Sequence, residues 1–398
     1  MLSPIDRRSA EILRALRNLG GVGTRADIVS ATGAARATVT EHVEAMIDSG
    51  LLAEGDLAPS SGGRKAQLVQ INPDTARIAV IDVGGSRTRV GLTDLTGRVL
   101  GADLANLPVE SGPEKILGWA ISALNTLIEA HGRTDRFLVV AGLPGPVDFS
   151  TGCVVSPPIM VGWEGFGTAG FLGTQLDAPV IVDNDVNLIA LAEQRLEHPE
   201  SKVLLVVKLG TGVGGGIVID GRVLRGARGA AGDIGHTQAS PPSTNLCRCG
   251  HVGCVEAEAG GWALVQELRS QGLNVNTVSE VAALARDGNP EAVASVHQSS
   301  RVVGAAIADA VSLLNPDTVV IVGELMDAGE HVLAMLREGV YQSSLPLATH
   351  DLVLTQGRLG PLVGILGGGQ LGTDVLFQDF QPTQQIGLAV LWHPQPST

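Results

Sequence analysis

The sequence predicts a mixed α/β protein that is preceded by a small helical segment. From residue 78 onward, short apolar runs such as IAVIDVGG and FLVVAGLPGP alternate with amphipathic runs of helical length, which is typical of α/β architectures. Before that point, the apolar residues recur at helical spacing. A chain of 398 residues is long enough for two or three domains. We therefore expect divisions at 1–75, 76–377 and 378–398, the last being a peripheral tail.

The composition is that of an acidic globular protein. The formal net charge is −14, yet the residues up to Asp74 carry 8 basic and 9 acidic side chains, so nearly all the negative charge lies beyond them. An acidic body excludes attachment of the whole protein to nucleic acid or an anionic membrane, but it is compatible with one local DNA-reading surface. The start of the chain lacks a signal-peptide core, and no apolar stretch approaches the roughly 18 residues of a membrane span. We expect a cytoplasmic protein without a membrane partner.

The amino-terminal segment has the pattern of a helix-turn-helix. A first helix ends before residue 20, a short second helix begins near Thr24 as its N-cap, and Gly33 makes the turn. The third helix is amphipathic, with an apolar face of Val39, Val43, Met46 and Ile47. Strands over 51–57 and 67–71 then flank a flexible loop that ends in two cations. This combination is typical of a winged helix-turn-helix domain.

This domain predicts DNA contacts at two places. The start of the third helix is expected in the major groove, where it would bring Arg36, Thr38 and Thr40 to phosphates or base edges. The wing is expected to reach the minor groove with Gly62, Gly63, Arg64 and Lys65. Because basic residues are few, specific binding is expected to need a dimer. The alternative is a small helical cap that carries a surface hairpin.

Two glycine-rich turns in the body suggest phosphate binding, and they hint at a duplicated fold with one turn in each half. Backbone N–H groups exposed by glycines can surround phosphate oxygens, and an adjacent carboxylate can hold a metal-bound water. The candidate residues are Asp82, Gly84, Gly85 and Ser86 in the first turn, and Gly210, Thr211 and Gly212 in the second. The alternative is that both turns are ordinary hairpins.

Asn184 and Asp185 follow an apolar strand and precede a helix, which is where ligand sites form in α/β folds. Asp185 is a candidate general base for a ligand hydroxyl such as that of a sugar, and Asn184 is a hydrogen-bonding partner of the same ligand. The alternative is that these side chains only cap the helix.

His236, Cys247, Cys249 and Cys254 form the strongest local signature. One histidine and three cysteines at this spacing make a closed tetrahedral set, which suits structural zinc in a reduced compartment. His251 is a spare candidate ligand, and free buried cysteines are the alternative. Asp233 and Glu256 flank the set, so a bound metal would fix two carboxylates near the ligand pocket.

Taken in order, these motifs resemble the ROK family of bacterial repressors and sugar kinases, from about residue 10 to residue 368. The matching strings are DVGGSRTRVGLTD, GLPGPVD, VDNDVNLIALAE, GTGVGGGIVIDG, GAAGDIGH and CRCGHVGCVEAE. The resemblance implies two actin-like, hexokinase-like (ribonuclease H-like) α/β lobes with a sugar in the cleft between them. It also implies that the sugar contacts Asn184, Asp185, His236 and Glu256, with Asp233 where the family usually has Glu, and that His236 binds zinc together with the three cysteines.

The first 80 residues distinguish two branches of this family. Pure kinases begin almost at the first glycine motif, whereas the segment found here is similar to the winged helix of the family's repressors, although Ala34-Ala35 replace the usual Leu-Ser and Glu41 stands where a cation is common. Val322-Gly323 stands where kinases have Gly-Gly near the adenosine.

We therefore expect a transcriptional regulator of sugar-metabolism genes, a repressor, that binds operator DNA as a homodimer or homotetramer and is controlled by a sugar or sugar phosphate. One alternative is a sugar kinase, or a bifunctional regulator and kinase, in which ATP and Mg²⁺ bind at the glycine turns and Asp185 is the base. A zinc-responsive switch is another alternative, which the closed ligand set disfavours.

Overall fold

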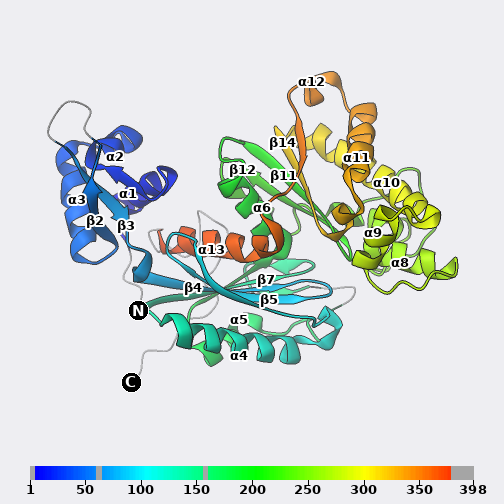
Figure 1. Cartoon of the computed structure of the whole chain (residues 1–398), viewed down its shortest axis with the longest axis horizontal. Coiled ribbons are helices and arrows are strands. Elements are labelled where there is room, and N and C mark those ends of the chain that lie inside the picture. Colours follow the sequence, from blue (N-terminus) through cyan, green and yellow to red (C-terminus); the bar gives the residue numbers. More distant parts are fainter. Residues whose placement is uncertain (1–4, 60–64, 156–159, 378–398) are drawn as a thin grey trace.

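The computed structural model describes residues 5–59, 65–155 and 160–377. Figure 1 shows a small amino-terminal unit beside two larger lobes, each built on a sheet. The predicted wing residues Gly62, Gly63 and Arg64, and the predicted tail 378–398, lie outside the described residues. Among the helices in the described ranges, none is both long and apolar enough to cross a membrane.

The amino-terminal unit consists of three helices and a three-stranded antiparallel sheet with strand order β1-β3-β2. Its elements are α1 (Arg7–Asn18), β1 (Val22–Thr24), α2 (Arg25–Thr32), α3 (Arg36–Asp48), β2 (Leu52–Leu57) and β3 (Gln67–Ile71). Thr24 caps α2 as predicted, because its hydroxyl accepts from the Asp27 N–H and Asp27 accepts from the Thr24 N–H. The sequence did not predict β1, since three residues are too few to show a strand period.

The first lobe is a five-stranded sheet with strand order β10-β7-β4-β5-β6. Its strands are β4 (Ala76–Val83), β5 (Thr88–Asp94), β6 (Val99–Ala105), β7 (Arg136–Leu143) and β10 (Val180–Asn184), next to a small pair of β8 (Val147–Asp148) and β9 (Cys153–Val154). Helices α4 (Pro113–His131) and α5 (Thr168–Leu176) pack against one face, and α6 (Asp185–Leu196) and α13 (Val363–Leu376) against the other. Because both faces are covered, every residue of β4 is buried.

The second lobe repeats the arrangement around a sheet with strand order β13-β12-β11-β14-β15. Its strands are β11 (Val203–Leu209), β12 (Val213–Ile219), β13 (Arg222–Val223), β14 (Thr318–Val322) and β15 (Val353–Gln356). Its helices are α7 (Val255–Ala259), α8 (Gly261–Ser270), α9 (Val278–Arg286), α10 (Pro290–Leu314), α11 (Glu330–Ser343) and α12 (Pro346–Thr349).

The internal duplication expected from the two glycine turns is visible in the strand pairing. In the first lobe, β4 pairs antiparallel with β5 and parallel with β7. In the second lobe, β11 pairs antiparallel with β12 and parallel with β14. Each glycine turn joins the two antiparallel strands of its lobe, so both turns occupy corresponding positions.

The amino-terminal unit shares a hydrophobic core with the first lobe. One continuous cluster of buried side chains includes Ile12 of α1 and Val43 of α3 together with Ile78 of β4 and the residue after α13, Phe377. An ionic network reinforces the contact: Asp374 of α13 lies 2.7 Å from Arg17 of α1 and 3.5 Å from Arg195 of α6. Helices α1, α13 and α6 are therefore connected to one another.

Candidate functional site

A cavity of about 510 Å³ lies between the two lobes. Residues of both glycine turns, of the start of α6 and of the segment around the His-Cys cluster line its wall. It brings together all the predicted ligand and phosphate residues, namely Asp82, Gly84, Gly85, Ser86, Asn184, Asp185, Gly210, Thr211, Gly212, Asp233, His236 and Glu256. Positions up to 174 residues apart in the sequence thus face one space.

The two glycine turns meet across this cavity. A Cβ atom on Gly85 would lie 2.9 Å from the hydroxyl oxygen of Thr211, so glycine is what permits the approach. Beside them, Asp82 is the second-last residue of β4 and its side chain is buried, and α13 passes so close that a side chain at Gly364 would clash with this carboxylate. Burial raises the pKa of Asp82, and the positive charge of Lys208 opposes that rise.

An ion pair between Arg87 and Glu324 crosses from one lobe to the other at the cavity wall. Arg87 lies in the β4–β5 turn, and Glu324 begins the short helix η4 (Glu324–Ala328) that follows β14. Both side chains are partly exposed, so water screens their attraction and the pair is a weak contact.

Asn184 has the capping role that the sequence left open as an alternative. Its side-chain oxygen accepts hydrogen bonds from the N–H groups of Val186 (2.9 Å) and Asn187 (3.4 Å), and its amide nitrogen donates to the carbonyl of Gly145 at 2.8 Å. It still lines the cavity, which leaves its second amide hydrogen for a ligand.

The carboxylates on either side of Asn184 have different partners. Asp183 accepts from Arg225 at 2.7 Å and 3.0 Å, and from Asn187 at 2.9 Å, with both members of the ion pair almost fully buried. Asp185 instead accepts from the ammonium of Lys208 at 2.6 Å and faces the cavity. Asp183 therefore anchors the start of α6, while Asp185 is the carboxylate available to a ligand.

Glu193, two turns along α6, is buried at 1% exposure and also lines the cavity. Burial, assisted by the charge of Glu197, raises its pKa to about 7. An acid with this shift keeps its proton when folded but loses it near pH 4.5 when unfolded, so the folded state loses stability as the pH rises from about 4.5 to about 7.

We therefore expect Glu193→Gln to remove this pH dependence and to stabilise the protein at pH 8 by up to about 3 kcal/mol. Urea unfolding of both proteins at pH 5 and pH 8 measures the effect. Glu200→Gln, a change at an exposed glutamate nearby, is the control. An identical loss of stability between the two pH values in the parent and Glu193→Gln would contradict the expectation.

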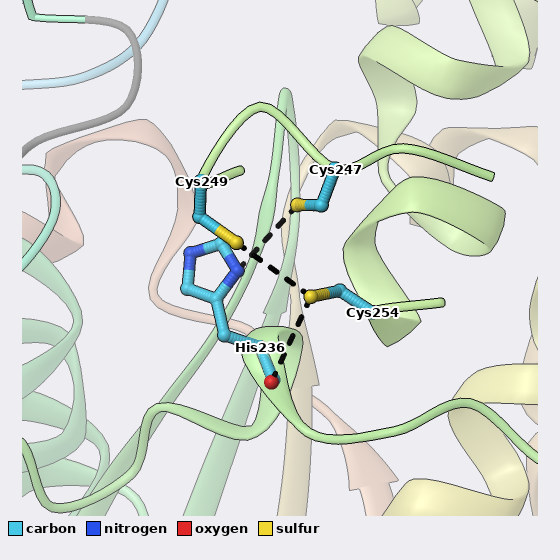
Figure 2. A group of neighbouring side chains, drawn as sticks. All are labelled: His236, Cys247, Cys249 and Cys254. Carbon is cyan, nitrogen blue, oxygen red and sulfur yellow. Dashed lines mark hydrogen bonds between the residues drawn. The ribbon is translucent and has the colours of Figure 1, made fainter. Parts of the chain in front are cut away.

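His236, Cys247, Cys249 and Cys254 converge, as their spacing predicted, and Figure 2 shows their side chains turned toward one another. Their four ligand atoms all lie within 4.8 Å of one another. The sulfur atoms of Cys249 and Cys254 are 3.6 Å apart, and the sulfur of Cys247 is 3.7 Å from Nδ1 of His236. Four ligands at about 2.3 Å around a tetrahedral ion would stand about 3.7 Å apart. The donor set therefore fits a tetrahedral metal ion.

The protonation of the thiols also favours a cation at this cluster. Burial and the neighbouring sulfur atoms raise the pKa of Cys254 to about 12, and burial raises that of Cys247, whereas hydrogen bonds with His251 outweigh burial and lower the pKa of Cys249 to about 7. Three adjacent thiols cannot all lose their protons without a positive charge between them. His251 also reaches Cys249, with Nδ1 at 3.5 Å from the sulfur, but it lies outside the four-residue group.

Arg248 links the cluster to the cavity. Its guanidinium stacks at 4.5 Å over the ring of Trp262 and lies 3.7 Å from the carboxylate of Glu256. Glu256 also accepts from the Val213 N–H at 3.1 Å and from the Trp262 ring N–H at 3.2 Å. Among the described residues, the buried Nε of Arg248 has no hydrogen-bond partner, and Arg248 itself lines the cavity.

The family assignment follows from the arrangement of the motifs along the whole body. The profile of the ROK family matches residues 78–370. The chain belongs to the ROK family. This range contains nearly all of both lobes, except the first two residues of β4 and the end of α13, and all the residues of the cavity wall.

Among the relatives of this ROK protein are both repressors and kinases. It is 28% identical to the xylose repressor of Caldicellulosiruptor bescii, over 83% of this chain and 87% of that protein. It is 29% identical to the DNA-binding transcriptional dual regulator NagC of Escherichia coli, over 88% of each chain. It is 30% identical to a glucokinase of Halalkalibacterium halodurans, over 73% of this chain and 93% of that protein.

Solved structures show the same division. A ROK family transcriptional regulator that is a homologue of the E. coli MLC protein superposes with a TM-score of 0.78 at 24% identity, over 93% of this chain and 96% of that chain, which shows a common fold. The glucokinase of Streptomyces griseus, solved with glucose and AMPPNP, gives a TM-score of 0.63 at 28% identity over 74% of this chain and 98% of that chain.

Sequence reasoning missed five charged residues of this ROK site. Lys208 lies two residues before the second glycine turn, and Arg248 lies between Cys247 and Cys249. Their positions in the sequence could therefore have indicated that they belong to the site. Arg87 lies within the quoted string DVGGSRTRVGLTD, and Glu324 directly follows Val322-Gly323, so they also had a local signal. Arg225 carries no local signal, because its partner Asp183 is distant in the sequence.

Proposed function

We propose that the protein is a DNA-binding transcriptional regulator, a repressor of sugar-metabolism genes, whose operator affinity is set by a sugar or sugar phosphate in the cleft. The observation that carries this proposal is the combination of two parts in one chain. A ROK body with a ligand cavity follows an amino-terminal unit of three helices and a hairpin. A kinase does not need this unit.

The amino-terminal unit has the features of a winged helix-turn-helix. Helices α2 and α3 are joined by a tight turn at Gly33, whose backbone is left-handed, and β2 and β3 form the hairpin of the wing. The outward face of α3 is open and presents Arg36 at its start. Thr38 and Thr40 are half-buried, and the Thr40 hydroxyl donates to the Arg36 carbonyl, while Lys65 at the wing is exposed.

The extent of the similarity to repressors supports the same assignment. The matches to the xylose repressor and NagC cover 83% and 88% of this chain. Both shares exceed what residues 78–398 alone would supply, so both matches extend into the amino-terminal unit. Because the relatives of this chain include proteins named xylose repressor and N-acetylglucosamine repressor, a sugar is the ligand class that we propose for the cavity.

Zinc is the metal that we propose for the His-Cys cluster. A set of one histidine and three cysteines leaves no open ligand position, which is typical of structural rather than catalytic zinc. The residues that would hold it are His236 and the three cysteines, and His236 also lines the cavity. We further propose that the protein binds a two-fold symmetric operator as a homodimer or homotetramer.

Sugar phosphorylation is the second candidate function. It is favoured by the glucokinase relative and by the two glycine turns that face each other across the cavity. Formation of ADP that depends on both sugar and protein, and that Asp185→Asn abolishes, would show this activity.

Fluorescence anisotropy on the DNA upstream of the protein's own gene, with a panel of sugars and sugar phosphates at fixed salt, tests the regulator. We expect one sugar to shift the affinity at least about tenfold, which is about 1.4 kcal/mol of coupling. Arg36→Ala should weaken DNA binding about tenfold or more, because it removes a contact at the groove, while calorimetry shows unchanged sugar binding.

Arg286→Ala is the matched control, since Arg286 is an exposed arginine of the second lobe. DNA binding by Arg36→Ala that equals the parent's would count against the assigned role of α3. If the upstream DNA binds under none of these conditions, the kinase assay becomes the deciding experiment.

A further inference from the structure

Lys208 holds an unusual position in the wall of the cavity. It lies on β11 two residues before Gly210, and its side chain is 26% exposed. Its ammonium donates to Asp185 at 2.6 Å, and the negative charges of Asp185, Asp82 and Glu324 together raise the pKa of Lys208 despite its burial. A permanent positive charge therefore lies within the field of three cavity carboxylates.

Two of these carboxylates are the ones that a phosphoryl-transfer site would use. Asp82, beside the first glycine turn, is the candidate for holding a metal-bound water, and Asp185 is the candidate base. Mg²⁺ needs nearly octahedral oxygen ligands at about 2.1 Å and retains several waters. An ammonium already bonded to Asp185 takes up one of these oxygens and repels a second cation.

We propose that the Lys208 ammonium, which is bonded to Asp185 and shares the cavity wall with Asp82, takes the place of a divalent cation there, so that the cleft binds its ligand without Mg²⁺ and leaves it unphosphorylated. The proposal deepens the proposed function, because a sensor must release its effector unchanged. The carboxylate of Asp185 still accepts a hydrogen bond from a ligand hydroxyl. It does not take the proton, since protonation would break the ion pair with Lys208.

The geometry of the surrounding wall supports the same conclusion. Lys208 is paired with Asp185, and Arg87 is paired with Glu324 at the same wall. Cationic side chains therefore already neutralise two of the cavity carboxylates. A Lys208→Ala change would leave Asp185 without its cation, remove a positive charge that acts on Asp82, and open the volume of the lysine side chain. A divalent ion would then find two unneutralised carboxylates in the same cavity wall.

The test is titration of the zinc-loaded full-length protein with Mn²⁺, followed by electron paramagnetic resonance of the free ion. We expect the parent to show no site with a Kd below about 1 mM, and Lys208→Ala to gain one Mn²⁺ site at least tenfold tighter. The double variant Asp82→Asn, Lys208→Ala should lose the gained site. Lys202→Ala, at an exposed lysine just before β11, should behave as the parent.

Equal Mn²⁺ affinity in the parent and in Lys208→Ala would overturn the proposal. So would a parent site tighter than about 0.1 mM that Asp82→Asn abolishes, a result that does not depend on whether Lys208→Ala folds. The assay uses neither DNA nor sugar, so its failure is separate from a failure of the proposed regulator.

Discussion

Replacing Cys254 by serine is expected to abolish metal binding and to lower the stability of the protein by about 4 kcal/mol or more, the range reached when a structural metal is lost. Cys254 is both a member of the four-residue donor set and the N-cap residue of α7. Its loss leaves three donors, which cannot close a tetrahedral site. Because Glu256 follows two residues later in the cavity wall, ligand binding should fall together with the metal content.

Cys153→Ser supplies the matched control for this change. Cys153 is the remaining cysteine of the chain, it is partly exposed, and it lies in β9 of the first lobe, outside the cluster. Elemental analysis should find about one zinc per chain in the parent and in the control, and almost none in Cys254→Ser. Thermal unfolding followed by circular dichroism measures the accompanying loss of stability. Full zinc content in purified Cys254→Ser would count against the metal site.

Arg225→Met is expected to destabilise the protein by about 3–5 kcal/mol, because it leaves the buried carboxylate of Asp183 without its cation. The side chains of Arg225 and Asp183 are 5% and 3% exposed, so water cannot replace the lost partner. Asp183 holds Asn187 in the first turn of α6, and the change should therefore also weaken ligand binding near Asn184 and Asp185.

A double-mutant cycle separates the buried charge from the lost packing. Adding Asp183→Asn to Arg225→Met removes the unpaired charge and should restore part of the stability. Arg286→Met is the control, since Arg286 pairs with Asp287 on the exposed surface. Urea unfolding at pH 7 measures the parent, both single variants, the double variant and the control. A loss below about 1 kcal/mol in Arg225→Met would show that the ion pair does not hold the start of α6.

Those parts of the fold whose signals are local could be predicted from the sequence. The Thr24–Asp27 capping box marks the start of α2, and the apolar run of β4 marks a strand covered on both faces. Helix α10 begins at Pro290, directly after its cap Asn289. An Asn-Pro pair is a start signal of this kind, so the full helix was within reach.

The ionic contacts of the site could not be predicted in the same way. Arg87 and Glu324 are separated by 237 residues, and Asp183 and Arg225 by 42, so only the tertiary fold decides that they meet. Asn184 shows a different limit, because a residue that begins a helix at a strand end suits capping and ligand binding equally well. Spacing located the His-Cys cluster because its members crowd into 19 residues, where few other arrangements are possible.

The core that α1 and α3 share with the first lobe has a mechanical consequence. The amino-terminal unit is not suspended on a linker, and the pattern boundary near residue 76 is no seam in the packing, since the buried cluster runs through it. Helix α6 starts in the cavity at Asp185, and its far end meets α13 and α1 at Asp374. A tilt of α6 would therefore be passed on to α1 through Asp374, and through the shared core to α3. In a two-fold symmetric dimer, the two amino-terminal units would move in opposite directions. A small rotation in each cleft would then change the distance between them by twice the movement of either unit.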